Sequence, residues 1–284
     1  MAADRKPIGL YLAIGWMSLC VLMSTIGDFL PLPNWRVGDY ENLGVGMFSK
    51  GHFFGTDTQG IDQLSAIVHG TRLSLTISFT SVIFGIIIGG FFGIVAAYSR
   101  GWLDKLILMY FNVSLSVPTI ILALALVSIF ASSNSMGQTS AFKRISTLIL
   151  TLGFVLIPIL GRIARASALS WTGRDFVLAA KAMGMKPLQI MWYHILPNVV
   201  PTLLSVGFLA AGVLIVVEGG LAILGAGVLD GSTWGAMLAT NRQLLTIYPH
   251  TTLLPAGAIA MTVLALNYFA DYIRNIIDGR ESRL

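Results

Sequence analysis

The residues from Arg174 to Pro197 read Arg-Asp-Phe-Val-Leu-Ala-Ala-Lys-Ala-Met-Gly-Met-Lys-Pro-Leu-Gln-Ile-Met-Trp-Tyr-His-Ile-Leu-Pro, a polar interruption between two long apolar runs. Asp175 is a predicted N-cap, because its carboxylate can accept hydrogen bonds from the free amides of a first helical turn. Apolar side chains then recur at helical spacing on one face, namely Phe176, Ala179, Ala180 and Met183. The two alanines keep that face thin. The pattern fits either a loop with two surface helices or an element that docks in a partner's groove.

The same stretch carries its own stop signals. Gly184 is predicted to end the first helix in the left-handed conformation. Lys186 is restricted by the proline after it, and Pro187 suits the first position of a second short helix. Pro197 is expected to break the chain again.

The composition is that of an integral membrane protein. Charged residues make up 11% of the chain and hydrophobic residues 55%, against about 25% and about 45–50% in soluble domains. The mean hydropathy is +0.79. The net charge of +5 is assigned to membrane topology, because no basic stripe interleaved with aromatics indicates nucleic-acid binding. The one cysteine, Cys20, can form no internal disulfide.

Six membrane crossings are predicted, so the expected fold is an all-α bundle of six transmembrane helices. The first apolar run is read as a retained anchor rather than a signal peptide, since it is too long and lacks a clear cleavage site. Each run is near or above the roughly 17–25 residues that a spanning helix needs. The predicted crossings are Ile8–Ile26, Leu73–Tyr98, Leu106–Ala131, Ile145–Gly161, Val199–Val217 and Thr251–Ala270.

The distribution of Lys and Arg predicts the orientation. Six crossings place both termini on one side, and twelve of the eighteen basic residues lie on that side. By the positive-inside rule, the termini and the 174–197 loop face the cytoplasm. The twelve are Arg5, Lys6, Arg100, Lys105, Arg162, Arg165, Arg174, Lys181, Lys186, Arg274, Arg280 and Arg283.

Between the first two crossings, residues 27–71 form a polar outer segment rich in turn residues. Apolar residues within it, Ile61, Leu64, Ile67 and Val68, share one helical face and suggest a short helix along the outer interface. Four glycines of the second crossing share much of one face, which lets helix backbones approach closely. They are Gly85, Gly89, Gly90 and Gly93.

Glu218 is the one acidic residue within the later apolar stretch, and Gly219 and Gly220 follow it. An intramembrane carboxylate is costly and is a functional hypothesis by default. Its position near the outer end of the crossing also fits a helix-end or inter-helix hydrogen bond. Both readings, a contact in the substrate path and a bond between helices, stay open.

The sequence lacks the motifs that would indicate ATP binding, metal binding or catalysis in this chain. The sequence contains no Gly-x-x-x-x-Gly-Lys-Ser/Thr, so no ATP site of the P-loop type is expected in this chain. The four histidines are scattered and no Cys-x-x-Cys occurs, so no metal site is predicted. No carboxylate pair or activated nucleophile indicates a catalytic site, and we expect no enzymatic activity.

The loop resembles the cytoplasmic loop of binding-protein-dependent ABC transporter permeases, usually written Glu-Ala-Ala-x3-Gly-x9-Ile-x-Leu-Pro. Ala179-Ala180, Gly184 and Leu196-Pro197 match it in spacing. Leu178 and His194 depart from the pattern in the manner of the dipeptide/oligopeptide/nickel branch.

Further blocks extend the resemblance, to the second-subunit type of peptide permease, from about Gly55 to the C-terminus. Ile61 departs from it, since an arginine is usual there. The matching blocks are Gly55-Thr56-Asp57, Gly70-Thr71-Arg72-Leu73-Ser74-Leu75, Gly101-Trp102-Leu103-Asp104, Ser116-Val117-Pro118, Trp234-Gly235-Ala236-Met237-Leu238 and Asn267-Tyr268-Phe269-Ala270-Asp271.

The resemblance implies the type I ABC importer permease fold and a division of the chain into three parts. Residues 1–72 hold the anchor helix and outer segment, residues 73–274 the permease core with its coupling loop at 174–197, and residues 275–284 a short cytoplasmic tail. Coupling to the ATPase would fall to Asp175, Phe176, Ala179, Ala180, Met183, Gly184, Leu196 and Pro197.

The resemblance also implies partners: a second homologous permease of a different chain, two cytoplasmic P-loop ATPases that bind ATP and Mg, and an extracytoplasmic substrate-binding protein. The chain itself would need no cofactor. It would lie, multi-pass, in a bacterial inner membrane and import di- or oligopeptides. Nickel complexes or other small solutes are alternative cargoes of the same branch. A secondary transporter that works without an ATPase is an alternative of another class. Only Glu218 and the prolines that interrupt three predicted crossings, Pro118, Pro158 and Pro255, favour it.

Overall fold

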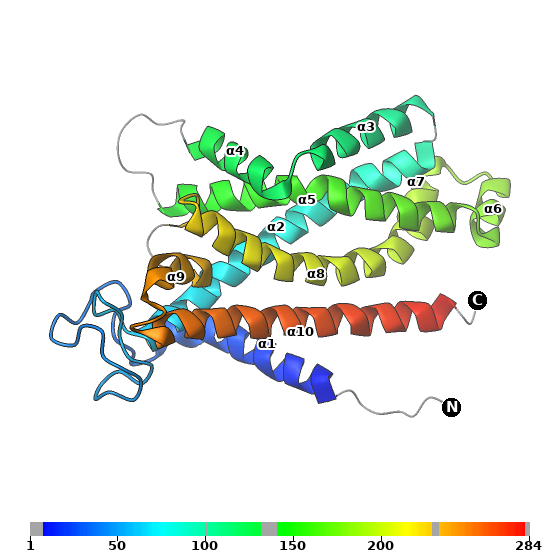
Figure 1. Cartoon of the computed structure of the whole chain (residues 1–284). Coiled ribbons are helices and arrows are strands. Elements are labelled where there is room, and N and C mark those ends of the chain that lie inside the picture. Colours follow the sequence, from blue (N-terminus) through cyan, green and yellow to red (C-terminus); the bar gives the residue numbers. More distant parts are fainter. Residues whose placement is uncertain (1–7, 100, 132–140, 229–232, 282–284) are drawn as a thin grey trace. The chain divides into compact units, whose positions relative to one another are not determined.

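The computed structural model describes residues 8–99, 101–131, 141–228 and 233–281 (Figure 1). Nearly all of the regular structure in these ranges is helical. Three helices are short, and the others are long and apolar. The α-helices are α1 (Ile8–Ile26), α2 (Gln63–Ser99), α3 (Trp102–Ser116), α4 (Thr119–Ala131), α5 (Ala141–Thr172), α6 (Asp175–Ala182), α7 (Pro187–Ile190), α8 (Leu196–Ile223), α9 (Trp234–Asn241) and α10 (Pro249–Glu281).

The chain folds into two compact units. One unit contains residues 1–78, 127–148 and 212–268, and the other contains residues 79–126, 149–211 and 269–284. Helices α2, α4, α5, α8 and α10 contribute residues to both units. The first unit holds Glu218 and the loop of residues 27–62, and the second holds the 174–197 loop.

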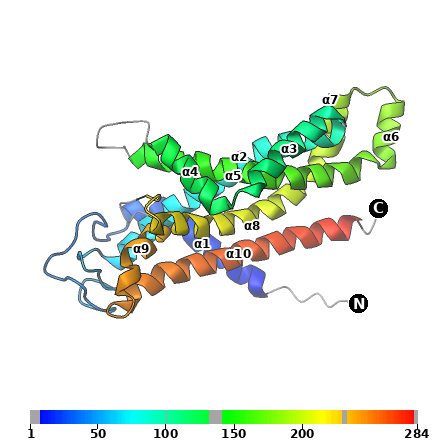
Figure 2. The ribbon, with the colours of Figure 1, turned by 45° about the horizontal axis from the view of Figure 1, so that its top comes forward.

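Within the described residues, five helices are long and apolar enough to cross a membrane, and a bent pair raises the number to six if it forms one broken span rather than a re-entrant loop. The bent pair replaces the continuous crossing predicted over Leu106–Ala131. Helices α3 and α4 meet at 94° (Figure 2). Pro118 causes the break, because a residue before proline is pushed out of the helical region, and Val117 is extended with ψ 131°.

Helix α2 corrects one predicted boundary. The short helix expected at residues 61–68 is not separate, because α2 runs without a break from Gln63 to Ser99. Asp62 precedes it and accepts a hydrogen bond from the amide of Ser65 at 2.8 Å, which satisfies one free donor of the first turn. The predicted division at residues 72 and 73 therefore falls inside a helix. Likewise α10 continues through residues 275–281 of the predicted tail, and residues 282–284 lie outside the described part.

Close approach of α2 and α5 builds the second unit, as the glycines of α2 predict. A Cβ atom on Gly89 would lie 2.5 Å from the carbonyl oxygen of Ile157, and one on Gly93 would collide with the carbonyl oxygen of Gly161. Only glycine allows backbones this near each other. The buried side chains around this contact include Ala164 and Leu160, both fully inaccessible to solvent.

In the first unit, α1 packs along α10. Trp16 donates its indole N–H to the hydroxyl of Thr262 at 2.9 Å, and a side chain on Gly9 would meet the ring of Tyr268. Thr262 in turn donates to the carbonyl of Ala258. Polar bonds of this kind fix the register of two apolar helices, since lipid supplies no competing partner.

Candidate coupling site

The start of α6 differs by one residue from the sequence prediction. Arg174, with φ −74° and ψ 149°, is the N-cap, and Asp175 is the first helical residue. No side chain caps this end. Asp175 nevertheless lies in the first turn, where a carboxylate interacts favourably with the positive end of the helix dipole.

The end of α6 confirms the predicted stop at Gly184. Its φ is +80°, and its amide donates to the carbonyl of Lys181 at 3.0 Å. The amide of Met185 donates to the carbonyl of Ala180 at 3.1 Å, which completes a Schellman motif. Lys186 is then extended, with ψ 148°, and Pro187 begins α7 as predicted.

The inner face of α6 packs on its own unit. Val177 and Ala180 are buried at 0% and 1% exposure, among Ala164, Ala168 and Trp171 of α5. This corrects the expectation that Ala180 shares an open face with Phe176, Ala179 and Met183. The helix turns Ala180 inward because Val177, three residues earlier on the same face, enters the same core.

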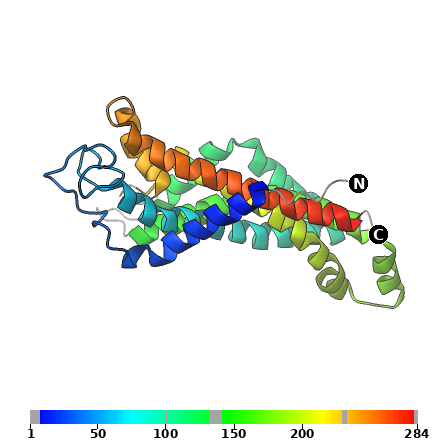
Figure 3. The ribbon, with the colours of Figure 1, turned by 90° about the horizontal axis from the view of Figure 1, so that it is seen from below.

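The outer face of α6 carries exposed apolar side chains. Figure 3 shows α6 as the short yellow-green helix at its lower right. Phe176 is 41% exposed and Met183 76% exposed, and Ala179 lies between them on the surface. Leu178 adds to the same exposed surface. Large apolar side chains are also exposed on the following segment, at Leu188, Trp192 and Tyr193. We call these residues, together with Phe176, Leu178, Ala179 and Met183, the coupling patch. Exposed apolar side chains in this number make the segment a candidate surface for contact with a partner.

The chain does not break at Pro197, contrary to the sequence prediction. Residues Met191–Ile195 form a π-helical turn that leads directly into α8, and Pro197 occupies the second position of α8. A proline inside a continuous helix removes one backbone hydrogen bond, and the π-helical turn directly before Pro197 accommodates that loss. The side chain of Asn198 donates to the carbonyl of His194 at 2.7 Å. Leu196 is partly buried against the same core, whereas Pro197 is exposed.

Two cations, Arg174 and Lys181, lie beside the coupling patch, and neither forms an ion pair with another described residue. The guanidinium of Arg174 lies 5.3 Å from the ring centroid of Trp171, and the ammonium of Lys181 lies 5.5 Å from that of Tyr98. Cation–π contacts orient both heads while leaving their charge available. The patch therefore presents apolar side chains with positive charge at its margin, which suits a groove with an acidic rim.

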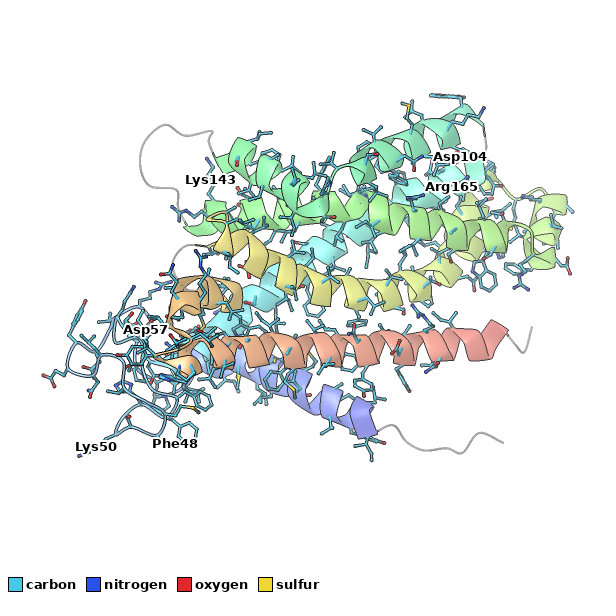
Figure 4. All side chains as sticks on the ribbon, in the orientation of Figure 1. Phe48, Lys50, Asp57, Asp104, Lys143 and Arg165 are labelled. Atoms are coloured by element: carbon cyan, nitrogen blue, oxygen red, sulfur yellow. The ribbon has the colours of Figure 1, made fainter. Side chains whose placement is uncertain are left out.

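The structure contains an ion pair that the sequence did not predict. Asp104 at the start of α3 receives two hydrogen bonds of 2.7 Å from the guanidinium of Arg165 on α5 (Figure 4). Both side chains are largely buried, at 17% and 23% exposure. A bidentate pair of this geometry fixes two helices firmly. The Gly-Trp-Leu-Asp block could have indicated this pair, since a carboxylate in the first turn of an apolar helix needs a partner.

Glu218 belongs to the first unit and lies between helices. It is 2% exposed, and its Oε1 accepts a hydrogen bond of 2.8 Å from the hydroxyl of Thr233. That hydroxyl also caps α9 by accepting from the amide of Ala236. In the described part of the chain, Oε2 of Glu218 has no hydrogen-bond partner, and it occupies the space that a side chain at residue 235 would need, so glycine is required there. The inter-helix bond is therefore present, and a role in the substrate path stays a prediction.

The Glu218 cluster extends to α2. The amide of Trp234 donates to the hydroxyl of Ser74 at 3.0 Å, and its indole N–H donates to the carbonyl of Ile67 at 3.1 Å. Trp234 is 1% exposed. The block Trp234–Leu238 thus forms a buried helix that joins α8 to α2 through side-chain bonds.

Comparison with known proteins identifies the family. The model of the family described as "Binding-protein-dependent transport system inner membrane component" matches residues 85–283. The chain belongs to this family. It is a multi-pass inner-membrane transport subunit, not an enzyme, and membership implies an ATPase and a substrate-binding protein as partners.

Similar curated proteins are transport permeases. The dipeptide transport system permease protein DppC of Alkalihalophilus pseudofirmus is 35% identical, over 82% of this chain and 73% of that protein. The glutathione transport system permease protein GsiD of Pectobacterium atrosepticum is 32% identical, over 85% of this chain and 77% of that protein. GsiD of Escherichia coli is 33% identical over 85% and 76% of the two chains.

Among solved structures, an inward-facing form of the MetNI methionine ABC transporter matches with a TM-score of 0.60. The match covers 75% of this chain and 97% of that one, at 22% identity. At this identity the likeness concerns the fold, which is the type I ABC importer permease fold.

Proposed function

We propose that this chain is the permease subunit of an ATP-driven importer of di- and oligopeptides, and that it forms half of the translocation path. The names of its relatives support the cargo, since one set transports dipeptides and another glutathione, itself a peptide. The observation that carries the transport mechanism is the coupling patch, a set of exposed apolar side chains on α6, between two candidate membrane spans, and on the start of the second of those spans.

The patch would dock in a groove of an ATPase subunit. Its residues project from a short helix whose opposite face is fixed in the core by Val177 and Ala180. A helix anchored in this way moves together with α5 and α8 as a lever. ATP with Mg would bind to the ATPase partners, close them, and so shift the membrane helices between inward-open and outward-open states. The substrate-loaded binding protein must favour one of those states, because a ligand without preference shifts no equilibrium.

The proposed assembly contains a second, different permease chain, two ATPase subunits and an extracytoplasmic binding protein. Both termini and the coupling patch would face the cytoplasm. The N-terminal 72 residues would serve as anchor and outer segment, residues 73–274 as the transport core, and residues 275–284 as a tail. The family match covers residues 85–283, which include most of the proposed transport core.

Uptake measurements test the transport proposal. Proteoliposomes that contain the full assembly and its binding protein should accumulate labelled dipeptide only with hydrolysable ATP inside. Vanadate or an ATPase variant that cannot hydrolyse ATP should abolish uptake. Accumulation driven by a proton gradient alone, with hydrolysis blocked, would instead identify a secondary transporter. Uptake of nickel complexes in preference to peptides would replace the cargo but keep the mechanism.

Cross-linking tests the docking of the coupling patch. A cysteine at Met183, with Cys20 replaced, should cross-link to the ATPase because this side chain is 76% exposed. Phe142 is 80% exposed at the start of α5, on the opposite predicted side, and a cysteine there is the matched control. Absence of a cross-link at Met183 in every nucleotide state would contradict docking.

A further inference from the structure

The loop of residues 27–62 lies outside the family match, which begins at residue 85. It contains a small hairpin, residues 47–54, whose two sides are joined by the amide of Phe48 donating to the carbonyl of Phe53 at 2.9 Å. The amide of His52 donates to the carbonyl of Ser49 at 3.0 Å and closes the turn. Gly51, with φ +88°, occupies the third turn position, as in a type II turn, which leaves Lys50 at the apex.

Phe48 has an unusual backbone conformation. Its φ is +63°, and among the described residues it is the one non-glycine with positive φ. For a bulky residue such a conformation is an outlier that persists only where its surroundings determine it. The hydroxyl of Ser49 donates to the carbonyl of Gly46 at 2.6 Å and holds this corner. The side chain of Phe48 is nevertheless 72% exposed, so packing of its ring does not explain the strain.

A polar cluster around the buried side chain of His52 stabilises the base of the hairpin. The imidazole of His52, 6% exposed, lies between two carboxylates, with Nδ1 2.8 Å from Asp62 and Nε2 3.3 Å from Asp39. Asp62 also accepts from the first turn of α2. Through Asp62, these contacts connect the hairpin to the start of the long helix α2. Preorganisation of this kind lowers the entropic cost of binding a partner.

The hairpin presents an aromatic and cationic tip. Phe48 and Phe53, the latter 56% exposed, meet edge to face with ring centroids 5.0 Å apart. Phe48 and Lys50 lie together at the edge of the 27–62 loop (Figure 4). Rigid aromatic side chains supply large contact area at low entropic cost, and they are frequent anchors of protein interfaces.

The charge of the 27–62 loop favours a protein over a lipid surface. The loop carries five carboxylates, Asp28, Asp39, Glu41, Asp57 and Asp62, against the two cations Arg36 and Lys50. This excess of negative charge opposes anionic headgroups, which attract basic clusters. A pair of aromatic rings with a single lysine at the adjoining turn suits an apolar pocket with a nearby carboxylate on a folded partner.

We propose that the 47–54 hairpin is a docking site for the substrate-binding protein, with Phe48 as its anchor and Lys50 as the group that pairs with a carboxylate of the partner. The inference rests on the proposed function, which supplies the partner. The strained backbone at Phe48 presents its ring outward, and the His52 cluster keeps the hairpin rigid while the transporter changes state.

The test measures the affinity of the peptide-loaded binding protein for the assembled transporter in nanodiscs. Phe48→Asn is the main variant, because asparagine tolerates positive φ and keeps the hairpin folded while the ring is removed. We expect its dissociation constant to rise tenfold or more, and that of Lys50→Glu to rise severalfold. Phe29→Asn is the matched control, since Phe29 is 84% exposed but lies outside the hairpin, and it should bind like wild type. Amide hydrogen exchange of residues 39–62 verifies that the hairpin is intact.

The outcomes separate this inference from the proposed function. Wild-type affinity of Phe48→Asn, with normal peptide uptake by the wild-type assembly, would overturn the docking site and leave the transport function standing. Equal weakening by Phe29→Asn would also overturn it. An effect that appears only in anionic lipid, and vanishes in neutral nanodiscs, would overturn it by assigning the hairpin to the membrane surface. Failure of the wild-type assembly to import peptide would instead refute the proposed function.

Discussion

Replacement of Gly184 by valine tests whether the geometry of the coupling patch matters for transport. A Cβ atom at Gly184 would meet no atom within 4 Å, so the substitution creates no clash. Its whole cost comes from the backbone, which has φ +80°. For an L-residue the left-handed conformation costs about 1–2 kcal/mol, and a β-branched side chain opposes it further.

That cost decides the expected size of the effect. A penalty of about 1–2 kcal/mol lowers the ratio of the capped to the uncapped end of α6 by roughly 5–30-fold. Without the cap, the bonds from Met185 to Ala180 and from Gly184 to Lys181 are lost, and α6 no longer holds a fixed angle to α7. We expect ATP-driven uptake by reconstituted Gly184→Val to fall severalfold, while affinity for the binding protein is unchanged.

Matched variants make the result decisive. Gly173 directly precedes the coupling loop and does not have positive φ, and a Cβ atom added there would meet no atom within 4 Å, so Gly173→Val should transport like wild type. Gly184→Asn should restore most of the uptake, because asparagine tolerates the left-handed region. Wild-type uptake by Gly184→Val, or an equal loss in Gly173→Val, would refute the reasoning.

Three further predictions concern other parts of the chain. Gly93→Leu should destabilise the purified assembly by about 1–3 kcal/mol, because the side chain would overpack against α5, and its thermal midpoint should fall while that of Gly15→Leu, at an open position, does not. Thr233→Val should cost about 2–4 kcal/mol through loss of the α9 cap and of the bond to Glu218, whereas Thr233→Ser should keep both; equal melting of the two variants would contradict this. Burial lowers the pKa of His52, but its hydrogen bonds to two carboxylates outweigh this effect, so the pKa is raised. The protonated imidazole therefore stabilises the 27–62 loop fully at pH below about 6.5, the ordinary pKa of histidine. This stabilisation is lost as the pH rises through the raised pKa. Amide exchange in the loop should accelerate over that rise in wild type, and an equal acceleration in His52→Gln would disprove the assignment.

The coupling loop shows which local features could be predicted. Gly184 ends α6 with positive φ, and Pro187 begins α7, because both depend on the conformational limits of single residues. Asp175 lies within one residue of the predicted helix start. The prediction for Ala180 chose the wrong face, since its neighbours on the helix gave no sign that α5 would receive it.

Some helix boundaries are set by the local sequence, and others are set by contacts with distant residues. Helix α1 begins at Ile8 and ends at Ile26 as predicted, because hydropathy alone sets its limits. Helix α2 begins about ten residues earlier than predicted, since Asp62 caps it inside the 27–62 loop. The effect of Pro118 is a 94° bend, whereas Pro197 is accommodated after a π-helical turn inside a continuous helix. Proline lacks an amide N–H to donate at both positions, and only the surroundings determine how the helix adapts to the missing hydrogen bond.

The sequence by itself determined the membrane class, the family, most of the candidate spans and the local turns, because hydropathy, glycine and proline act through neighbouring residues. The tertiary structure alone decided which side chains face the core of each unit, the bond between Glu218 and Thr233, and the pairing of Asp104 with Arg165. Those contacts join residues 15 and 61 positions apart, and their geometry depends on how helices pack rather than on any local preference.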